Sequence, residues 1–251
     1  KAYYDADFKP NLEGFSMKNL MKLSLVALLT AAAIPAMAGK TEPYTQSGTN
    51  AREMLQEQPI HWISVDQIKK ELEGKGPINV SFDIDDTVLF TSSCFYYGQQ
   101  KYSPGKQDYL KNQDFWNEVN AGCDKYSIPK QIAADLIKMH QERGDQIYFI
   151  TGRTAGNVDG VTPILQKAFD IKNMHPVEFM GGRERTTKYN KTPGIIAHKV
   201  SIHYGDSDDD VLAAKEAGIR GIRLMRAANS TYQPMPTLGG YGEEVLINSS
   251  Y

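Results

Sequence analysis

The chain has 251 residues, of which 41% are hydrophobic and 23% are charged. This composition is that of a globular protein with a full core, and it excludes collagen, a coiled-coil array and bulk disorder. The 28 Lys and Arg nearly balance the 30 Asp and Glu, so the composition does not favour a nucleic-acid polymer as partner, which would need a basic stripe. The two cysteines are too few for a disulfide scaffold or a zinc ribbon.

The segment 17–38, MKNLMKLSLVALLTAAAIPAMA, has the pattern of an export signal. Two lysines precede the apolar run Leu23–Ala33, and a small-x-small cleavage site follows. The apolar run is too short to span a bilayer. We therefore expect translation to start at Met17, with residues 1–16 as upstream or appended sequence, and the mature protein to be periplasmic, start at Gly39 and stay off the membrane.

Residues 39–60 are polar and contain two prolines, which indicates a mobile arm before a domain over residues 61–251. We predict helices over 64–73, 129–143, 161–169, 188–198 and 211–217. The first of them has capping-box spacing at Ser64 and a stop at Gly74. Predicted strands span 78–84, 146–150, 177–180, 200–204, 221–225 and, at an edge, 244–247. This alternation predicts an α/β fold, Rossmann-like, with a mostly parallel sheet covered by helices on both faces.

Residues 90–126 interrupt the alternation directly after the first predicted strand end. The segment is rich in Phe, Tyr and Trp, and it carries too many large apolar side chains for a solvent loop. We expect it to form a small helical cap over the site.

Three predicted strands run into polar residues that can do chemistry. These are Asp83-Ile84-Asp85-Asp86-Thr87, Thr151-Gly152-Arg153 and Gly205-Asp206-Ser207-Asp208-Asp209-Asp210. Because the carboxyl ends of parallel strands meet at one edge, we expect these segments to lie together. Carboxylates that lie together repel unless a cation or a raised pKa relieves them. Oxygen-only ligands favour Mg²⁺.

The sequence resembles the haloacid dehalogenase superfamily in its four motifs. They appear here, in order, as Asp83-x-Asp85-x-Thr87, Thr151, Lys188 and Gly205-Asp206-Ser207-x-x-Asp210. The flanking segments FDIDDTVLF, TGR, YGDSDDD, RAANSTY and GEEVLINS narrow this to a resemblance with the bacterial class B nonspecific acid phosphatases. The similarity extends from Pro59 to Tyr251. It implies a phosphomonoesterase that acts through an aspartyl-phosphate.

The resemblance also implies roles for the strand-end acids. Asp83 attacks phosphorus as the nucleophile, and Asp85 protonates the leaving oxygen and then deprotonates water. An acid that starts protonated is consistent with an acidic pH optimum. In the resembled family Mg²⁺ takes the Asp83 side chain, the Asp85 carbonyl and Asp206, with Asp210 in support. Asp208 and Asp209 are interpreted as solvated loop acids.

The phosphoryl oxygens are expected to bind the Thr151 hydroxyl, the Gly152 N–H and a lysine. Sequence position alone leaves the lysine open among Lys172, Lys188, Lys191 and Lys199. Thr187-Lys188 before a predicted helix matches the third family motif, so Lys188 is selected. Arg153 is either a further phosphate ligand or an exposed surface residue.

The family places an apolar and aromatic leaving-group pocket at Phe95, Leu110, Trp116 and Tyr232. Aromatic faces accept many rings without reading hydrogen bonds, so we expect activity on nucleotides, aryl phosphates and sugar phosphates. Transfer of the phosphoryl group to an alcohol is an expected side activity. By resemblance the protein is expected to be a homotetramer.

Cys94 and Cys123 both lie in the predicted cap, and either a disulfide or two free thiols is compatible with the sequence. The five histidines show no metal-ligand spacing, and His203 is interpreted as a core residue. Two other classes of protein compete with the enzyme. A signalling receiver should lack both an acid at position 85 and an export signal, and an exported binding protein would keep the fold without turnover.

Overall fold

The computed structural model describes residues 60–251. Three predictions lie outside the described residues, namely those for residues 1–16, for the export signal at 17–38 and for the arm at 39–60. Ile60 is the one residue of the arm that the structure describes. Among the residues from 60 onward, no helix is both long and apolar enough to cross a membrane.

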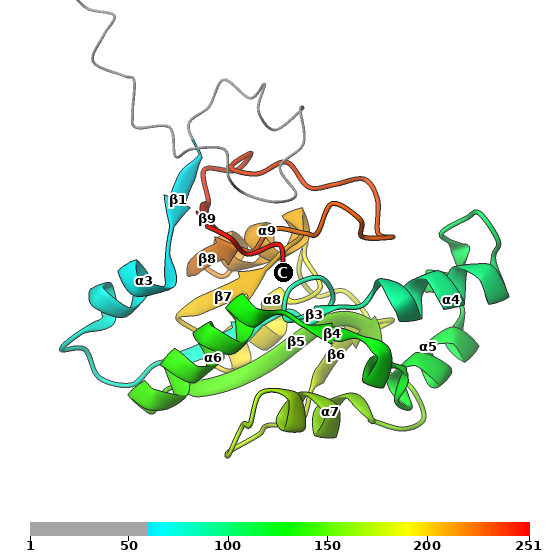
Figure 1. Cartoon of the computed structure of the whole chain (residues 1–251), viewed down its shortest axis with the longest axis horizontal. Coiled ribbons are helices and arrows are strands. Elements are labelled where there is room, and N and C mark those ends of the chain that lie inside the picture. Colours follow the sequence, from blue (N-terminus) through cyan, green and yellow to red (C-terminus); the bar gives the residue numbers. More distant parts are fainter. Residues whose placement is uncertain (1–59) are drawn as a thin grey trace, which may run out of the picture. The chain divides into compact units, whose positions relative to one another are not determined.

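The core of the fold is a sheet of seven parallel strands in the order β1-β9-β8-β7-β2-β5-β6 (Figure 1). In chain order the strands are β1 (His61–Ile63), β2 (Asn79–Phe82), β5 (Gln146–Thr154), β6 (Glu178–Gly181), β7 (Ile202–Gly205), β8 (Arg220–Arg223) and β9 (Glu244–Leu246). Because every pair is parallel, all the carboxyl ends face one edge. The predicted mostly parallel sheet is confirmed.

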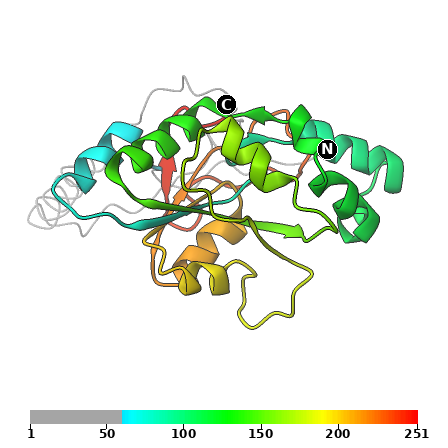
Figure 2. The same cartoon turned by 90° about the horizontal axis from the view of Figure 1, so that it is seen from below.

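Helices cover both faces of this sheet (Figure 2). One face carries α3 (Val65–Leu72), α6 (Gln131–Arg143) and α7 (Val161–Ala168), and the other carries α8 (Thr192–Ala197) and α9 (Asp208–Glu216). The predicted capping box at Ser64 is present. Under α6, the ring of Phe82 stacks on that of Tyr204, with centroids 4.7 Å apart.

The sheet edge differs from the prediction. The segment 244–247 was expected at an edge, but β9 lies between β8 and β1, and the outermost strand is β1. The sequence did not predict β1, because three residues give no measurable alternation. The strand exists because His61, Trp62 and Ile63 pair with residues 244–246 at the other end of the described chain.

Two prolines correct the helix boundaries. The expected helix 188–198 is only α8, with Pro193 in its first turn and Lys191 as its N-cap residue. Pro129 does not open α6 but ends the short strand β4 (Ile128–Pro129), and Lys130 occupies the N-cap position of the helix. Proline favours a first helical turn because it lacks an N–H, and this position fits Pro193.

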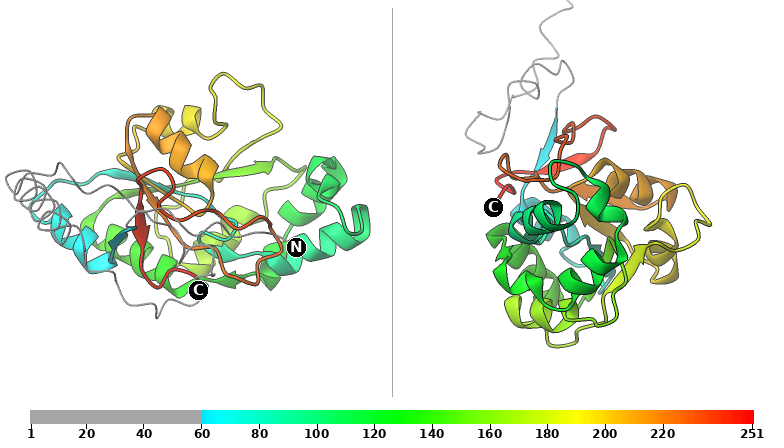
Figure 3. Two further views of the ribbon diagram at one scale, coloured as in Figure 1. Left: turned by 90° about the horizontal axis from the view of Figure 1, so that it is seen from above. Right: turned by 90° about the vertical axis from the view of Figure 1, so that its right-hand side faces the viewer.

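The insertion between β2 and α6 is helical, as predicted. Its elements are α4 (Ser92–Tyr102), η2 (Asp108–Lys111), α5 (Gln113–Asn120) and η3 (Cys123–Tyr126). Figure 3 shows α4 and α5 together at one end of the sheet. The antiparallel pair of β3 (Leu89–Phe90) and β4 closes the insertion, which we call the cap. The cap has its own core, formed by Phe95, Tyr109, Phe115, Trp116 and Val119 with Cys94.

The two cysteines of the cap form a disulfide between Cys94 of α4 and Cys123 of η3, with Cα atoms 5.9 Å apart. Of the two states that the sequence left open, the structure therefore has the bonded one. The bond closes a sequence separation of 29 residues. It joins the first and last helical elements of the cap.

Candidate active site

Asp83 directly follows β2 and continues its ladder, because its N–H donates to the carbonyl of Tyr204 at 2.8 Å. The chain then turns sharply, and the N–H groups of Thr87, Val88 and Leu89 all lie 3.0 to 3.3 Å from the Ile84 carbonyl. This turn brings the Thr87 hydroxyl to 3.3 Å from Asp83 Oδ2 and 3.2 Å from Asp206 Oδ1. Thr87 thus links the ends of β2 and β7.

Asp206 and Asp210 enter the site from the junction of β7 and α9. Ser207 is the N-cap of α9 and forms a capping box with Asp210, whose carboxylate accepts the Ser207 N–H at 3.1 Å. Gly205 must be glycine here, since a Cβ would lie 2.3 Å from the Cβ of Asp210. The close approach of strand end and helix start is what turns Asp210 inward.

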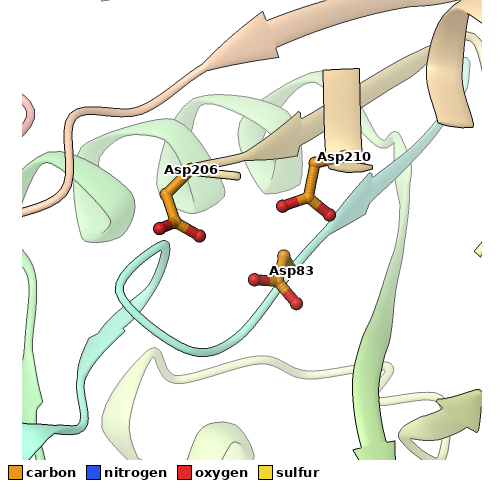
Figure 4. Close-up of side chains that lie close together, drawn as sticks. All are labelled: Asp83, Asp206 and Asp210. Carbon is orange, nitrogen blue, oxygen red and sulfur yellow. The ribbon is translucent and has the colours of Figure 1, made fainter. Parts of the chain in front are cut away.

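The structure brings the carboxylates of Asp83, Asp206 and Asp210 together, with one oxygen of each within 4.8 Å of the others (Figure 4). All three are buried. Burial raises the pKa of Asp83 well above its usual value, and the charges of Asp210 and Asp206 raise it further against the opposing effect of Lys191. The position of these acids after parallel strands thus predicted correctly that residues far apart in the chain converge here.

The lysine at this cluster is Lys191, which corrects the selection of Lys188. Lys191 Nζ lies 2.5 Å from both Asp83 Oδ1 and Asp210 Oδ1, and it is buried. Burial acts to raise the pKa of Asp210, but Lys191 and His203 outweigh it and lower that pKa. Lys188 is exposed, with its Nζ over the Tyr189 ring at 5.4 Å.

One feature of the sequence favours Lys191, although the match to the third family motif favours Lys188. Pro193 inside a supposed helix marks its first turn, so the helix had to begin near Thr192. That start places Lys191 at the N-cap and leaves Lys188 in the preceding loop. Lys172 and Lys199, the other two alternatives, do not line the cavity.

The Asp85 side chain does not join the three-carboxylate cluster but pairs with Arg153. Arg153 Nε and Nη2 donate to its two oxygens at 2.9 and 2.7 Å. Arg153 is 1% exposed, so the interpretation of an exposed surface residue is wrong. Its other edge binds Asp124 of the cap at 2.6 and 3.0 Å. No sequence pattern indicates Asp124, because a lone acid in an aromatic segment belongs to no motif.

A second group of buried charges lies beside Asp206. Arg226 Nε donates to Asp206 Oδ2 at 2.6 Å, and Ser230 donates to Asp86 Oδ2 at 2.6 Å. Burial and the charge of Asp206 raise the pKa of Asp86 to about 7. Burial lowers the pKa of Lys130 to about 8, although Asp206 and Asp86 oppose it. Arg226 and Ser230 both lie in the RAANSTY segment, which contributes to the family resemblance but predicts no role for either residue.

The cluster opens into a cavity of about 600 Å³ between the strand ends and the cap. All four residues predicted for the leaving-group pocket line it, namely Phe95, Leu110, Trp116 and Tyr232. The Tyr232 ring stacks under the Arg226 guanidinium at 4.6 Å. Apolar side chains thus form one wall of the cavity, and the carboxylates form another.

The two predicted phosphate-binding residues of β5, Thr151 and Gly152, lie in different surroundings. Gly152 lines the cavity, and a Cβ there would lie 3.9 Å from Lys191 Cε. Thr151 is fully buried, and its hydroxyl accepts the Arg153 N–H at 3.2 Å. Thr151 therefore holds the backbone turn in this structure.

The remaining predicted residues are also located. His203 is a core residue, as interpreted, within hydrogen-bond distance of Ser81 at 2.7 Å and of Asp210 at 3.2 Å. Asp208 and Asp209 are not loop residues, since both belong to the first turn of α9. Asp208 pairs with Arg223 at 2.9 Å.

The donor set at the cluster fits a hard divalent cation. It offers only carboxylate oxygens, and three buried cations, Lys130, Lys191 and Arg226, lie beside four acids, namely the three clustered aspartates and Asp86. Asp86 Oδ1 is buried with no hydrogen-bond partner among the described residues. A site short of positive charge in this way is suited to a further cation.

Comparison with known proteins agrees with this geometry. The family model of the HAD superfamily, subfamily IIIB (acid phosphatase), matches residues 26–235. A class B acid phosphatase of Haemophilus influenzae is 89% identical over 94% of this chain and 100% of its own length. That of Aggregatibacter actinomycetemcomitans is 87% identical with the same coverage.

Among solved structures, a haloacid dehalogenase-like hydrolase from Streptococcus pneumoniae superposes with a TM-score of 0.42 and 15% identity. The superposition covers 68% of this chain and 93% of that one. The family assignment rests on the sequence identity to the two acid phosphatases and on the length of the family match. The chain belongs to the class B acid phosphatases, subfamily IIIB of the HAD superfamily, and is an acid phosphatase.

Proposed function

We propose that this acid phosphatase is exported, depends on Mg²⁺ and hydrolyses a broad range of phosphomonoesters through an aspartyl-phosphate on Asp83. The observation that carries the proposal is the buried cluster of Asp83, Asp206 and Asp210 with Lys191 at the wall of an open cavity. A binding protein without turnover would not need a nucleophile, an acid and a lysine at one cavity.

In the first half of the reaction an Asp83 oxygen attacks phosphorus, and the bond from phosphorus to the leaving oxygen breaks. Asp85 gives its proton to that oxygen, so the leaving group departs as a neutral alcohol. In the second half Asp85 takes a proton from water as the water oxygen attacks phosphorus. The bond from phosphorus to Asp83 then breaks, which releases phosphate and restores both side chains.

Lys191 holds the phosphoryl oxygens and keeps Asp83 aimed, with the Gly152 N–H as a further donor. A carboxylate is a weak nucleophile, so orientation and charge neutralisation must supply most of the acceleration. HAD phosphatases generally use a divalent metal. When bound by Asp83, Asp206 and the Asp85 carbonyl, with Asp210 in support, Mg²⁺ would neutralise the phosphoryl oxygens.

The wall of Phe95, Leu110, Trp116 and Tyr232 supports the proposed substrate range. It offers apolar contact to the leaving group and few directed hydrogen bonds, so nucleotides, aryl phosphates and sugar phosphates should all enter. An alcohol that occupies this wall in place of the departed group can accept the phosphoryl group from Asp83. This is the proposed phosphotransferase activity.

Export to the periplasm is supported by the sequence of residues 17–38. The disulfide between Cys94 and Cys123 is consistent with an oxidising compartment. We further propose a homotetramer, which rests on the resemblance alone. The partners are small phosphomonoesters, with neither a nucleic-acid polymer nor, after signal cleavage, a membrane.

Metal removal tests the central claim. We expect hydrolysis of p-nitrophenyl phosphate at acidic pH to be abolished by EDTA and restored by Mg²⁺. In the Asp206→Asn variant much higher Mg²⁺ should be required, because one ligand oxygen is lost. Full activity in EDTA would contradict the proposed metal dependence.

A further inference from the structure

One cysteine of the cap disulfide directly precedes a cavity residue, and the other directly precedes the acid that binds Arg153. Cys94 precedes Phe95, which lines the cavity, and Cys123 precedes Asp124. The disulfide therefore joins the backbone beside Phe95, in the leaving-group wall, to the backbone beside Asp124. Asp124 is buried and only 2% exposed. No step of the proposed reaction uses Asp124.

Asp124 is held in one orientation by several groups. Its two oxygens accept from Arg153 at 2.6 and 3.0 Å. The Ser127 hydroxyl donates to Asp124 Oδ1 at 3.0 Å, and Asn120 Oδ1 accepts from Arg153 Nη1 at 3.4 Å. The cap thus supplies a fixed acceptor surface for one edge of the guanidinium.

The other edge of Arg153 binds Asp85, with Nε and Nη2 each donating to one oxygen. A guanidinium is planar, and its donors have a fixed geometry. Fixing one edge on Asp124 therefore fixes the direction in which the other edge presents Asp85. Of the three side chains linked in this way, that of Asp85 is the exposed one. It is 25% exposed, whereas those of Arg153 and Asp124 are 0% exposed.

We propose that Asp124 is a positioning residue for the reaction, which aims Asp85 through Arg153, and that the Cys94–Cys123 disulfide holds Asp124 in place. The inference rests on the proposed role of Asp85 as the acid. An acid must lie within hydrogen-bond reach of the leaving oxygen, and small displacements cost rate. Without Asp124, Arg153 pairs with Asp85 alone and its orientation is no longer set by the cap.

Leaving groups of different basicity test this inference. An alkyl phosphate such as glycerol 2-phosphate needs the proton, whereas 2,4-dinitrophenyl phosphate releases a stable anion without it. In Asp124→Asn we expect kcat/KM to fall about tenfold for the alkyl ester and less than about twofold for the dinitrophenyl ester. A merely structural loss would lower both equally.

Two further variants sharpen the test. The double variant Cys94→Ser with Cys123→Ser should show the same graded loss to a smaller extent, because Asp124 keeps its side-chain partners. Asp108→Asn serves as the matched control, since Asp108 is an exposed acid of the cap whose one ion-pair partner among residues 60–251 is Lys111. Its kcat/KM should be unchanged for both esters.

The Asp85→Asn variant separates the inference from the proposed function. A graded loss in Asp85→Asn with a uniform loss in Asp124→Asn overturns the positioning role alone. A uniform loss in Asp85→Asn overturns the acid itself and the inference with it. If Asp124→Asn does not fold, Ser127→Ala, which removes one hydrogen bond to Asp124, must show the graded loss, and a uniform loss there overturns the inference.

Discussion

Buried aspartates lie at both ends of the sheet, and their surroundings differ. Just before β5, Asp145 accepts from His140 Nδ1 at 2.7 Å, from the Ile78 N–H at 2.8 Å and from Arg143 Nε at 3.0 Å. Burial acts to raise the pKa of Asp145, but these partners outweigh it and the pKa falls below its usual value. At the opposite end burial raises the pKa of Asp83.

The difference shows how one residue type serves two purposes. The acid at the amino ends of the strands has enough donors to be a stable anion, so it ties β2, α6 and β5 together. The acids at the carboxyl ends share too few cations, and their charge remains available for a metal and a phosphoryl group. Substitutions at the two ends should therefore separate activity from stability.

The largest expected effect is on turnover in Asp83→Asn. Loss of the nucleophile should lower kcat for p-nitrophenyl phosphate by more than about 10³-fold. The melting temperature of the EDTA-treated protein should not fall, because burial already disfavours the Asp83 carboxylate. Melting curves and initial rates on one preparation would check both. A variant with half of the wild-type rate would exclude Asp83 as the nucleophile.

The next effect distinguishes Lys191 at the start of α8 from Lys188 in the loop before it. Lys191→Met should lower kcat/KM by on the order of 10²-fold, because it removes a buried charge that faces the phosphoryl group. Lys188→Met should stay within about twofold of the wild type, since an exposed lysine over a tyrosine ring contributes little. The same assay measures both variants. The reverse order would restore the family-based selection of Lys188.

The smallest effect is on stability at the amino ends of the strands. Asp145→Asn should lower the free energy of unfolding by about 1–3 kcal/mol at neutral pH and leave kcat unchanged. Because folding lowers the pKa of Asp145 below its ordinary value of 3.8, its contribution is present above that pH and is lost as the pH falls through the folded pKa. Denaturant titrations at pH 7 and at pH 3 should therefore show a difference between variant and wild type that shrinks in acid. A difference that grows in acid would contradict this assignment.

The sequence predicted the parts of the molecule that local pattern and strand order determine. Asp83 and Asp206 follow apolar strands, so a parallel sheet had to bring them to one edge. The sequence could not predict β1 or the role of Asp124 in the cap, because both depend on partners far away in the chain. Lys191 was a different case, since the position of Pro193 indicated it and the motif comparison outweighed that indication.

The ion pair between Asp124 and Arg153 has a consequence for protein engineering. Exchanging the cap for that of another phosphatase is an obvious route to new leaving-group preference, because the cap contributes Phe95, Leu110 and Trp116 to the cavity. A graft chosen only for its pocket side chains would leave the buried Arg153 with one acidic neighbour in place of two. A successful chimera must therefore carry an acid in register with position 124, so the insertion is not a freely interchangeable module.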